Sequence, residues 1–157
     1  MDDLMLARAL HVVAGVLWIG GVGFVTLALL PVLGRDRAQE SWFTRFAAFE
    51  RRFAWIARIM VLVAGGSGFY LIVALDAWDR FGSASYWWMH AMVIVWAIFT
   101  LFLFVLEPLV FERVQARIAK ASPSRAHRLI TRLHWVLLAL SLIAVFGAVA
   151  GSHGGFL

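Results

Sequence analysis

Three of the five histidines in this chain lie near the ends of long apolar stretches. His11 is about two helical turns into the first stretch, His90 is about one turn into the third, and His153 lies just beyond the fourth. Neutral imidazole binds haem iron, copper and zinc through a ring nitrogen. Imidazoles at matched depth on opposite helices can bind one haem iron from both faces. We therefore predict that His11 and His90 ligate haem b, with His153 beside them as a further metal ligand or hydrogen-bond donor.

The residues that follow His11 on the same helical face are small and aromatic. Gly15 and Trp18 stand at the i+4 and i+7 positions from His11, so all three share one face. A glycine there leaves room for a flat porphyrin, so we predict that Gly15 and Trp18 contact the cofactor. The alternative for the many glycines of these stretches is structural, because small residues let helices pack closely in a bilayer.

A second group of polar residues lies toward the other end of the same stretches. Arg58, Glu107 and His134 fall within about two turns of that membrane boundary. A carboxylate, an imidazole and a guanidinium at similar depth suit a quinone head group, because quinone reduction couples electrons to protons and histidine titrates near neutrality. The alternative is a structural ion pair between Arg58 and Glu107.

Copper is the alternative to haem. The chain has no cysteine and five methionines, and two of these, Met89 and Met92, flank His90. Thioether sulfur suits Cu(I), although methionine at helical spacing also fills cores. A copper-binding or copper-transporting membrane protein that uses His11, His90 and His153 is therefore the second candidate function. A third is an accessory subunit of a larger redox complex.

The elements that position these residues are four apolar stretches, at 4–33, 53–75, 87–111 and 133–151. A bilayer core of about 30 Å needs about 20 apolar residues in a helix, and each stretch approaches or exceeds that length. Hydrophobic residues make up 63% of the 157 residues and charged residues only 15%, far from a soluble domain. We predict an all-α integral membrane protein: a single domain at 1–157, folded as an up-down-up-down four-helix bundle with the first and third helices on a diagonal. No nucleophile or nucleotide motif occurs, so hydrolase and kinase chemistry is excluded; any enzymatic activity is expected to be that of a membrane oxidoreductase.

The basic residues fall into two clusters, one between the first and second stretches and one between the third and fourth. They are Arg35, Arg37, Arg45, Arg51, Arg52 and Arg58, and Arg113, Arg117, Lys120, Arg125, Arg128 and Arg132. The positive-inside rule then predicts a bacterial inner-membrane protein with cytoplasmic basic loops and periplasmic N- and C-termini. Because Met1–Asp3 is acidic, the first stretch is expected to be a retained helix and not a signal peptide. The net charge of +5 is assigned to topology and lipid contact, and not to nucleic acid. A homodimer or a larger redox complex is expected from the glycine-rich faces.

Short motifs in the first three stretches resemble two known membrane-protein families. Ala9–Val13 followed by Leu17–Gly21 is similar to the first helix of the CopD-like copper-resistance proteins and of the HemJ-type protoporphyrinogen oxidases. Phe49–Phe53 with the later Arg58–Met60, and Trp88–Ala91, resemble the starts of the second and third HemJ-type helices. The HemJ-type resemblance implies a four-helix haem b protein in which His11 matches the first-helix histidine, with protoporphyrinogen oxidation as an alternative function. The CopD-like resemblance implies copper handling at the inner membrane.

Overall fold

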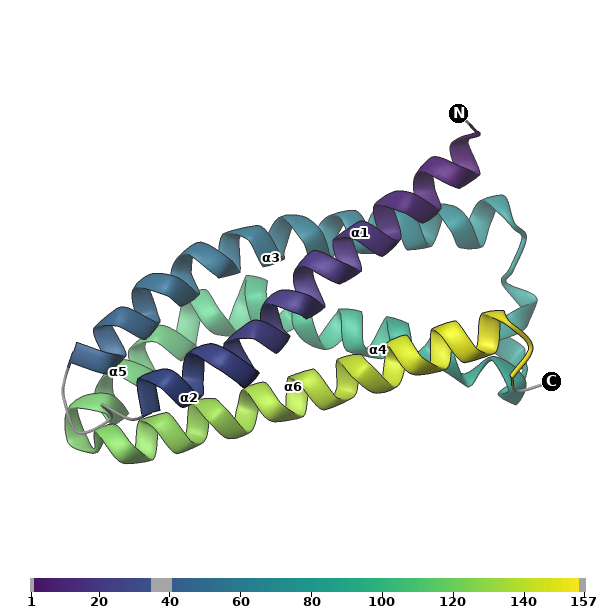
Figure 1. Cartoon of the computed structure of the whole chain (residues 1–157). Coiled ribbons are helices and arrows are strands. Elements are labelled where there is room, and N and C mark those ends of the chain that lie inside the picture. The colour runs from purple at the N-terminus through teal and green to yellow at the C-terminus, as the bar shows by residue number, and fades with distance from the viewer. Residues whose placement is uncertain (1, 35–40, 156–157) are drawn as a thin grey trace.

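The computed structural model describes residues 2–34 and 41–155, without the side chains at 41, 110–112 and 115–116. Throughout these ranges the chain is helical, with short turns and no strand (Figure 1). The elements, in order, are α1 (Asp3–Phe24), the π-helix η1 (Val25–Leu29), α2 (Leu30–Leu33), α3 (Ser41–Ala74), the short 3-10 helices η3 (Asp79–Gly82) and η4 (Ala84–Tyr86), α4 (Trp87–Leu101), the π-helix η5 (Phe102–Phe111), α5 (Glu112–Ala121) and α6 (Pro123–Ser152). Arg35 and Arg37 of the first basic cluster lie outside the described residues.

Among the described residues, four helical rods are long and apolar enough to cross a membrane, at Asp3–Leu33, Trp42–Ala74, Ala84–Leu109 and Pro123–Ser152. Their outward faces carry large apolar side chains; Phe146 is 71% exposed, Val16 66% and Trp55 63%. A surface this apolar is stable against lipid and not against water. The prediction of an all-α, multi-pass membrane bundle is therefore confirmed.

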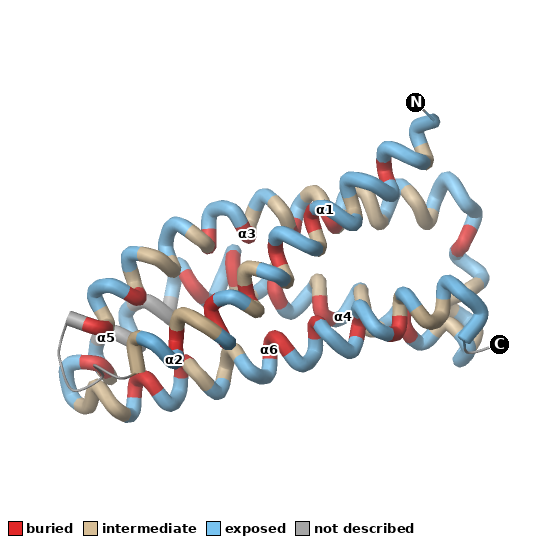
Figure 2. The backbone as a smooth tube through the Cα atoms, viewed as in Figure 1, coloured by how far each residue is buried: buried red, intermediate tan, exposed pale blue. Residues whose placement is uncertain are grey.

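The rods close into a ring in which sequence neighbours pack side by side. α1 packs mainly on α3, and α4 packs mainly on α6, while α1 also contacts α6 and α3 contacts α4. α1 and α4 are therefore the diagonal pair, and both begin at the end of the bundle where the first and last described residues lie (Figure 1). Buried residues follow the inner faces of the rods (Figure 2).

Two of the helices extend further than the apolar stretches that predicted them. α3 begins at Ser41 and not near position 53, and α6 begins at Pro123 and not near position 133. Hydropathy marks the apolar part of a helix, whereas these extensions are polar outside and held by a second small core. That core contains Val25, Leu30, Trp42, Phe46, Ala119, Ala126 and Ile130. We call this end of the bundle, where α2, α5 and the starts of α3 and α6 meet, the arginine-rich end.

Several glycines admit a bulky neighbour, as the structural alternative predicts. A Cβ atom on Gly65 of α3 would lie 2.6 Å from Trp96 Nε1 of α4, and one on Gly151 of α6 would lie 2.0 Å from Trp88 Nε1. The Trp96 indole N–H donates a hydrogen bond to the carbonyl of Val61 across the same contact, at 2.9 Å. These glycines therefore bring α3, α4 and α6 into close contact.

Candidate functional site

A buried ion pair joins α3 to η5 in the half of the bundle nearer the arginine-rich end. The Glu107 side chain is 8% exposed and pairs with the guanidinium of Arg58, which is 18% exposed. Arg58 Nε also donates to the carbonyl of Leu103 at 3.0 Å. The predicted contact between Arg58 and Glu107 is therefore present, as the structural alternative requires.

The π-helix explains why Arg58 finds a backbone carbonyl to bind. In a π-helix the N–H of residue i bonds to the carbonyl of residue i−5, and proline has no N–H. Pro108 lies inside η5, so it leaves the carbonyl of Leu103 without its helical donor. Arg58 supplies that donor from the neighbouring helix. The side chain of Arg58 thus donates a hydrogen bond to the carbonyl of Leu103 and also pairs with the buried carboxylate of Glu107.

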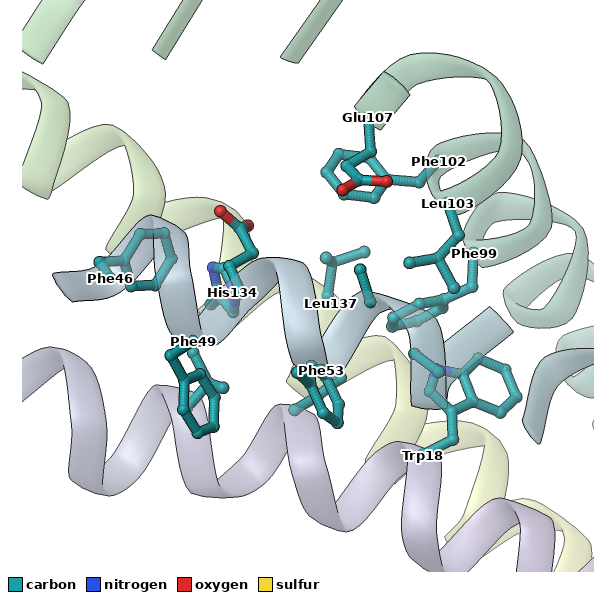
Figure 3. Close-up of a pocket in the computed structure, with 15 residues that line it drawn as sticks. Trp18, Phe46, Phe49, Phe53, Phe99, Phe102, Leu103, Glu107, His134 and Leu137 are labelled. Carbon is teal, nitrogen blue, oxygen red and sulfur yellow. The ribbon is translucent and has the colours of Figure 1, made fainter. Parts of the chain in front are cut away.

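Glu107 and His134 line one cavity, together with Glu50 and a ring of apolar side chains (Figure 3). The aromatic members of the lining are Trp18, Phe46, Phe49, Phe53, Phe99 and Phe102. The cavity has a volume of about 50 Å³, which is room for a few water molecules. The structure therefore brings two of the three residues predicted for this end to one cavity, and places Arg58 against one of them.

His134 is held by its own helix and by an aromatic ring. Its Nδ1 donates to the carbonyl of Ile130 at 3.0 Å, and its ring meets that of Phe46 edge to face at 6.0 Å. With the proton on Nδ1, the lone pair of the neutral ring is on Nε2. His134 can therefore accept a proton at Nε2 without giving up the bond that orients it.

Trp18 contributes a buried donor to the same cavity. Its ring meets Phe99 edge to face at 4.7 Å, so α1 and α4 touch here across the diagonal. Trp18 is 5% exposed, and its indole N–H has no hydrogen-bond partner among the described residues. Buried polar groups without a partner are rare and costly, and each calls for an explanation such as a bound ligand or water.

Part of this cavity escaped the sequence reasoning. Glu50 was not assigned to the polar group, although Phe46, Phe49, Glu50 and Phe53 recur at helical spacing, and that signal marks one face of a helix. Trp18 was predicted as a cofactor contact below His11. The structure places it at the cavity that Glu107 and His134 line.

His11 is anchored to α3 by one edge of its ring. Its Nδ1 lies 2.9 Å from the carbonyl oxygen of Ala64 and 3.2 Å from Ser67 Oγ. Donation from Nδ1 to that carbonyl leaves the lone pair on Nε2, the arrangement by which proteins orient a metal-binding histidine. The predicted space at Gly15 is present, because no atom of the described residues beyond its own stretch of helix would lie within 4 Å of a Cβ there.

The other two histidines of the predicted site lie on exposed surfaces. His90 is exposed on α4, where its ring meets that of Phe81 at 5.2 Å. His153 is exposed after α6, with Nδ1 bonded to the carbonyl of Val149 at 2.8 Å. Within the described ranges, no three His, Cys, Asp or Glu side chains group as a metal site would require. The structure therefore does not gather His11, His90 and His153 into one cluster, and their roles as ligands stay predictions.

His127 was missed by the sequence reasoning and is buried near the arginine-rich end. Its Nε2 donates to the carbonyl of Leu30 at 3.0 Å, and its ring meets Trp42 at 5.4 Å. A Cβ on Gly34 would lie 2.7 Å from Nε2, so a glycine is needed for this approach. His127 ties α6 to α2 and α3, a structural role.

Comparison of the chain with family models, curated proteins and solved structures finds no match. The resemblance to CopD-like and HemJ-type proteins therefore stays a prediction that depends on short motifs.

Proposed function

We propose that this chain is a membrane redox protein that binds the head group of a quinone in the cavity beside Glu107 and His134. The observation that carries the proposal is the buried indole N–H of Trp18, which has no partner among the described residues and belongs to a cavity whose other polar members include a buried carboxylate and an imidazole. A quinone is a flat apolar ring with a carbonyl at each end. Its ring matches the aromatic lining, one carbonyl can accept from the indole N–H of Trp18, and the other can accept from His134 when Nε2 carries a proton.

The spacing of the polar groups fits such a ring. Trp18 contacts Phe99, and Glu107 follows Phe99 by eight residues on the same rod, which is at most about 12 Å along a helix. The two carbonyl oxygens of a quinone, with C=O bonds of about 1.23 Å on opposite sides of a ring, are about 5 Å apart. A hydrogen bond of about 2.8 Å at each end brings the total to about 11 Å. One ring with a hydrogen bond at each end therefore has about the length of the rise between the level of the Trp18–Phe99 contact and the level of Glu107.

Each polar residue then has a distinct role. Arg58 neutralises Glu107 and holds it in position, His134 Nε2 receives and returns protons, and the indole of Trp18 donates to the distal carbonyl. Reduction of a quinone to a quinol takes two electrons, which a one-electron donor such as haem would supply, and two protons, so a histidine next to the ring matches the proton half of the chemistry. A ring exceeds the present cavity, so its entry requires half-buried side chains such as Phe53 to turn.

The test compares two tryptophans that both bury an unpartnered N–H. Trp18→Phe keeps an aromatic ring and removes the indole N–H at the cavity. Trp42→Phe removes a buried indole N–H from a residue that does not line the cavity. A hydrogen bond worth about 0.5–1.5 kcal/mol predicts that Trp18→Phe weakens binding of a short-chain ubiquinone roughly 2- to 12-fold in lipid nanodiscs, measured by calorimetry. Trp42→Phe is expected to leave the affinity unchanged. Equal affinities in all three proteins, or no binding by the parent protein, would contradict the proposal.

Haem b binding at His11 is a second candidate, favoured by the hydrogen bond from Nδ1 to Ala64 and the open space at Gly15. These residues fit an axial ligand role, because Nε2 retains the lone pair and α3 fixes the ring. Bound haem would supply one-electron transfer, and the chain's contribution is to hold and orient the imidazole. Addition of haem to the purified protein, followed by visible spectroscopy of the parent and His11→Ala, tests this: a Soret band that depends on His11 supports it, and its absence from the parent excludes it.

A further inference from the structure

The contact between Trp18 and Phe99 fixes how α1 and α4 face each other. 

The ring of Trp18 on α1 lies 4.7 Å from that of Phe99 on α4, and the two helices run in the same direction. α1 is a regular α-helix from Trp18 back to Asp3, and α4 is one from Phe99 back to Trp87. A position the same number of residues before each member of the pair therefore lies at the same height.

His11 and Met92 occupy such matched positions. His11 precedes Trp18 by seven residues, and Met92 precedes Phe99 by seven. Seven residues are about 10.5 Å of rise and about 20° short of two full turns. His11 and Met92 therefore lie on the helix faces that carry Trp18 and Phe99, each about two turns nearer the start of its own helix.

Burial agrees with this assignment. Met92 is half-buried and packs against the central core. His11 is half-buried on the stripe of α1 that also buries Ala7, Ala14 and Trp18. Both side chains therefore belong to the inner faces of the diagonal helices.

His90 lies on the other side of α4. It precedes Phe99 by nine residues, which is about two and a half turns, so it faces away from the contact with Trp18. Its exposure and its contact with Phe81 agree with that phase. His90 therefore lies at a depth similar to that of His11, but on the face of α4 that points away from α1.

We propose that Met92, and not His90, is the second axial ligand of a haem b bound by His11. The inference rests on the haem-binding candidate above and is independent of the quinone cavity. Haem brings its own equatorial nitrogens, so two axial donors complete its coordination, and histidine with methionine is an established pair that raises the reduction potential. His11 would bind through Nε2, the nitrogen that its bond to Ala64 leaves with a lone pair.

The test uses the full chain in detergent with haem added, and compares Met92→Leu with His90→Ala two residues away. Leucine keeps the size and apolar character of methionine, so the fold is expected to persist, and far-ultraviolet circular dichroism checks it. The parent is expected to be low-spin, with the sulfur-to-iron charge-transfer band in the oxidised state. Met92→Leu is expected to lose that band, become high-spin and fall in reduction potential, while His90→Ala keeps the parent spectrum.

The contrary results are distinct. A low-spin Met92→Leu together with a high-spin His90→Ala would assign the bis-histidine pair and overturn the inference while leaving haem binding intact. A parent that takes up no haem, or that retains stoichiometric copper in its place, would overturn both the inference and the candidate on which it rests. Neither result bears on quinone affinity, which the Trp18 and Trp42 variants measure separately.

Discussion

Removal of Arg58 is expected to destabilise the bundle strongly, because two buried groups depend on it. In Arg58→Met the carboxylate of Glu107 loses its ion pair with Arg58, and the carbonyl of Leu103 loses the donor that Pro108 cannot provide. Loss of one partner of a buried ion pair costs about 3–5 kcal/mol. The side chain of Glu107 is 8% exposed, so solvent cannot replace the lost interaction fully. We expect a fall of about 3–5 kcal/mol in the free energy of unfolding.

The assay is equilibrium unfolding in mixed detergent micelles, with Glu107→Leu and the double variant completing a cycle. Replacement of both charges by apolar residues is often neutral or stabilising, so the double variant is expected to recover most of the loss. Pro108→Ala in the Arg58→Met background restores a backbone donor and is expected to recover about 1 kcal/mol. Additive losses in the cycle, with no recovery in the double variant, would refute the reasoning that the cost comes from the lost ion pair with Arg58.

Three further predictions concern close contacts. Gly65→Ala places a Cβ 2.6 Å from Trp96 Nε1 and is expected to lower the free energy of unfolding by about 1–3 kcal/mol. Gly66→Ala meets no described atom beyond its own helix within 4 Å and is expected to be neutral or stabilising by up to about 1 kcal/mol. Equal effects of the two variants in the same unfolding assay would contradict the contact between Gly65 and Trp96. His127→Ala is expected to lower the free energy of unfolding by about 1–3 kcal/mol, because it leaves the carbonyl of Leu30 without this donor. His153→Ala, at an exposed position, should change stability by less than about 0.5 kcal/mol. A neutral His127→Ala would contradict the stabilising contact between α6 and α2. Gly68→Ala places a Cβ 3.0 Å from His11 Cε1 and is expected to shift the imidazole and change the spectrum of the haem-loaded protein; an unchanged spectrum would place the bound haem away from this ring.

The bundle could be predicted from sequence because lipid imposes a simple requirement on each span. Long apolar stretches are identified by their composition, and short connections force neighbouring helices to run antiparallel. The helix ends could not be predicted in the same way. The start of α3 is stabilised by Trp42 and Phe46, which pack on residues of α5 and α6 far away in the sequence, and no local signal reports such contacts.

The polar residues of the site were predicted by depth, and depth alone leaves the direction of a side chain open. Counting residues placed Arg58, Glu107 and His134 at one level, and the structure brings Glu107 and His134 to one cavity with Arg58 paired to Glu107. The same counting paired His11 with His90, whereas helical phase turns His90 outward. The bond from His11 to the carbonyl of Ala64 could not be read from sequence, because any residue offers a carbonyl and only the packing of α1 on α3 selects this one.

The most direct test of the quinone proposal is photo-cross-linking with an azido-quinone in lipid nanodiscs, followed by peptide mapping. The account predicts labels on cavity residues from α3, η5 and α6, such as Phe53, Phe102 and Leu137, and loss of those labels when unmodified quinone is added in excess. Labels confined to the lipid-facing side chains, such as Phe146 or Val16, and insensitive to that competitor would contradict it.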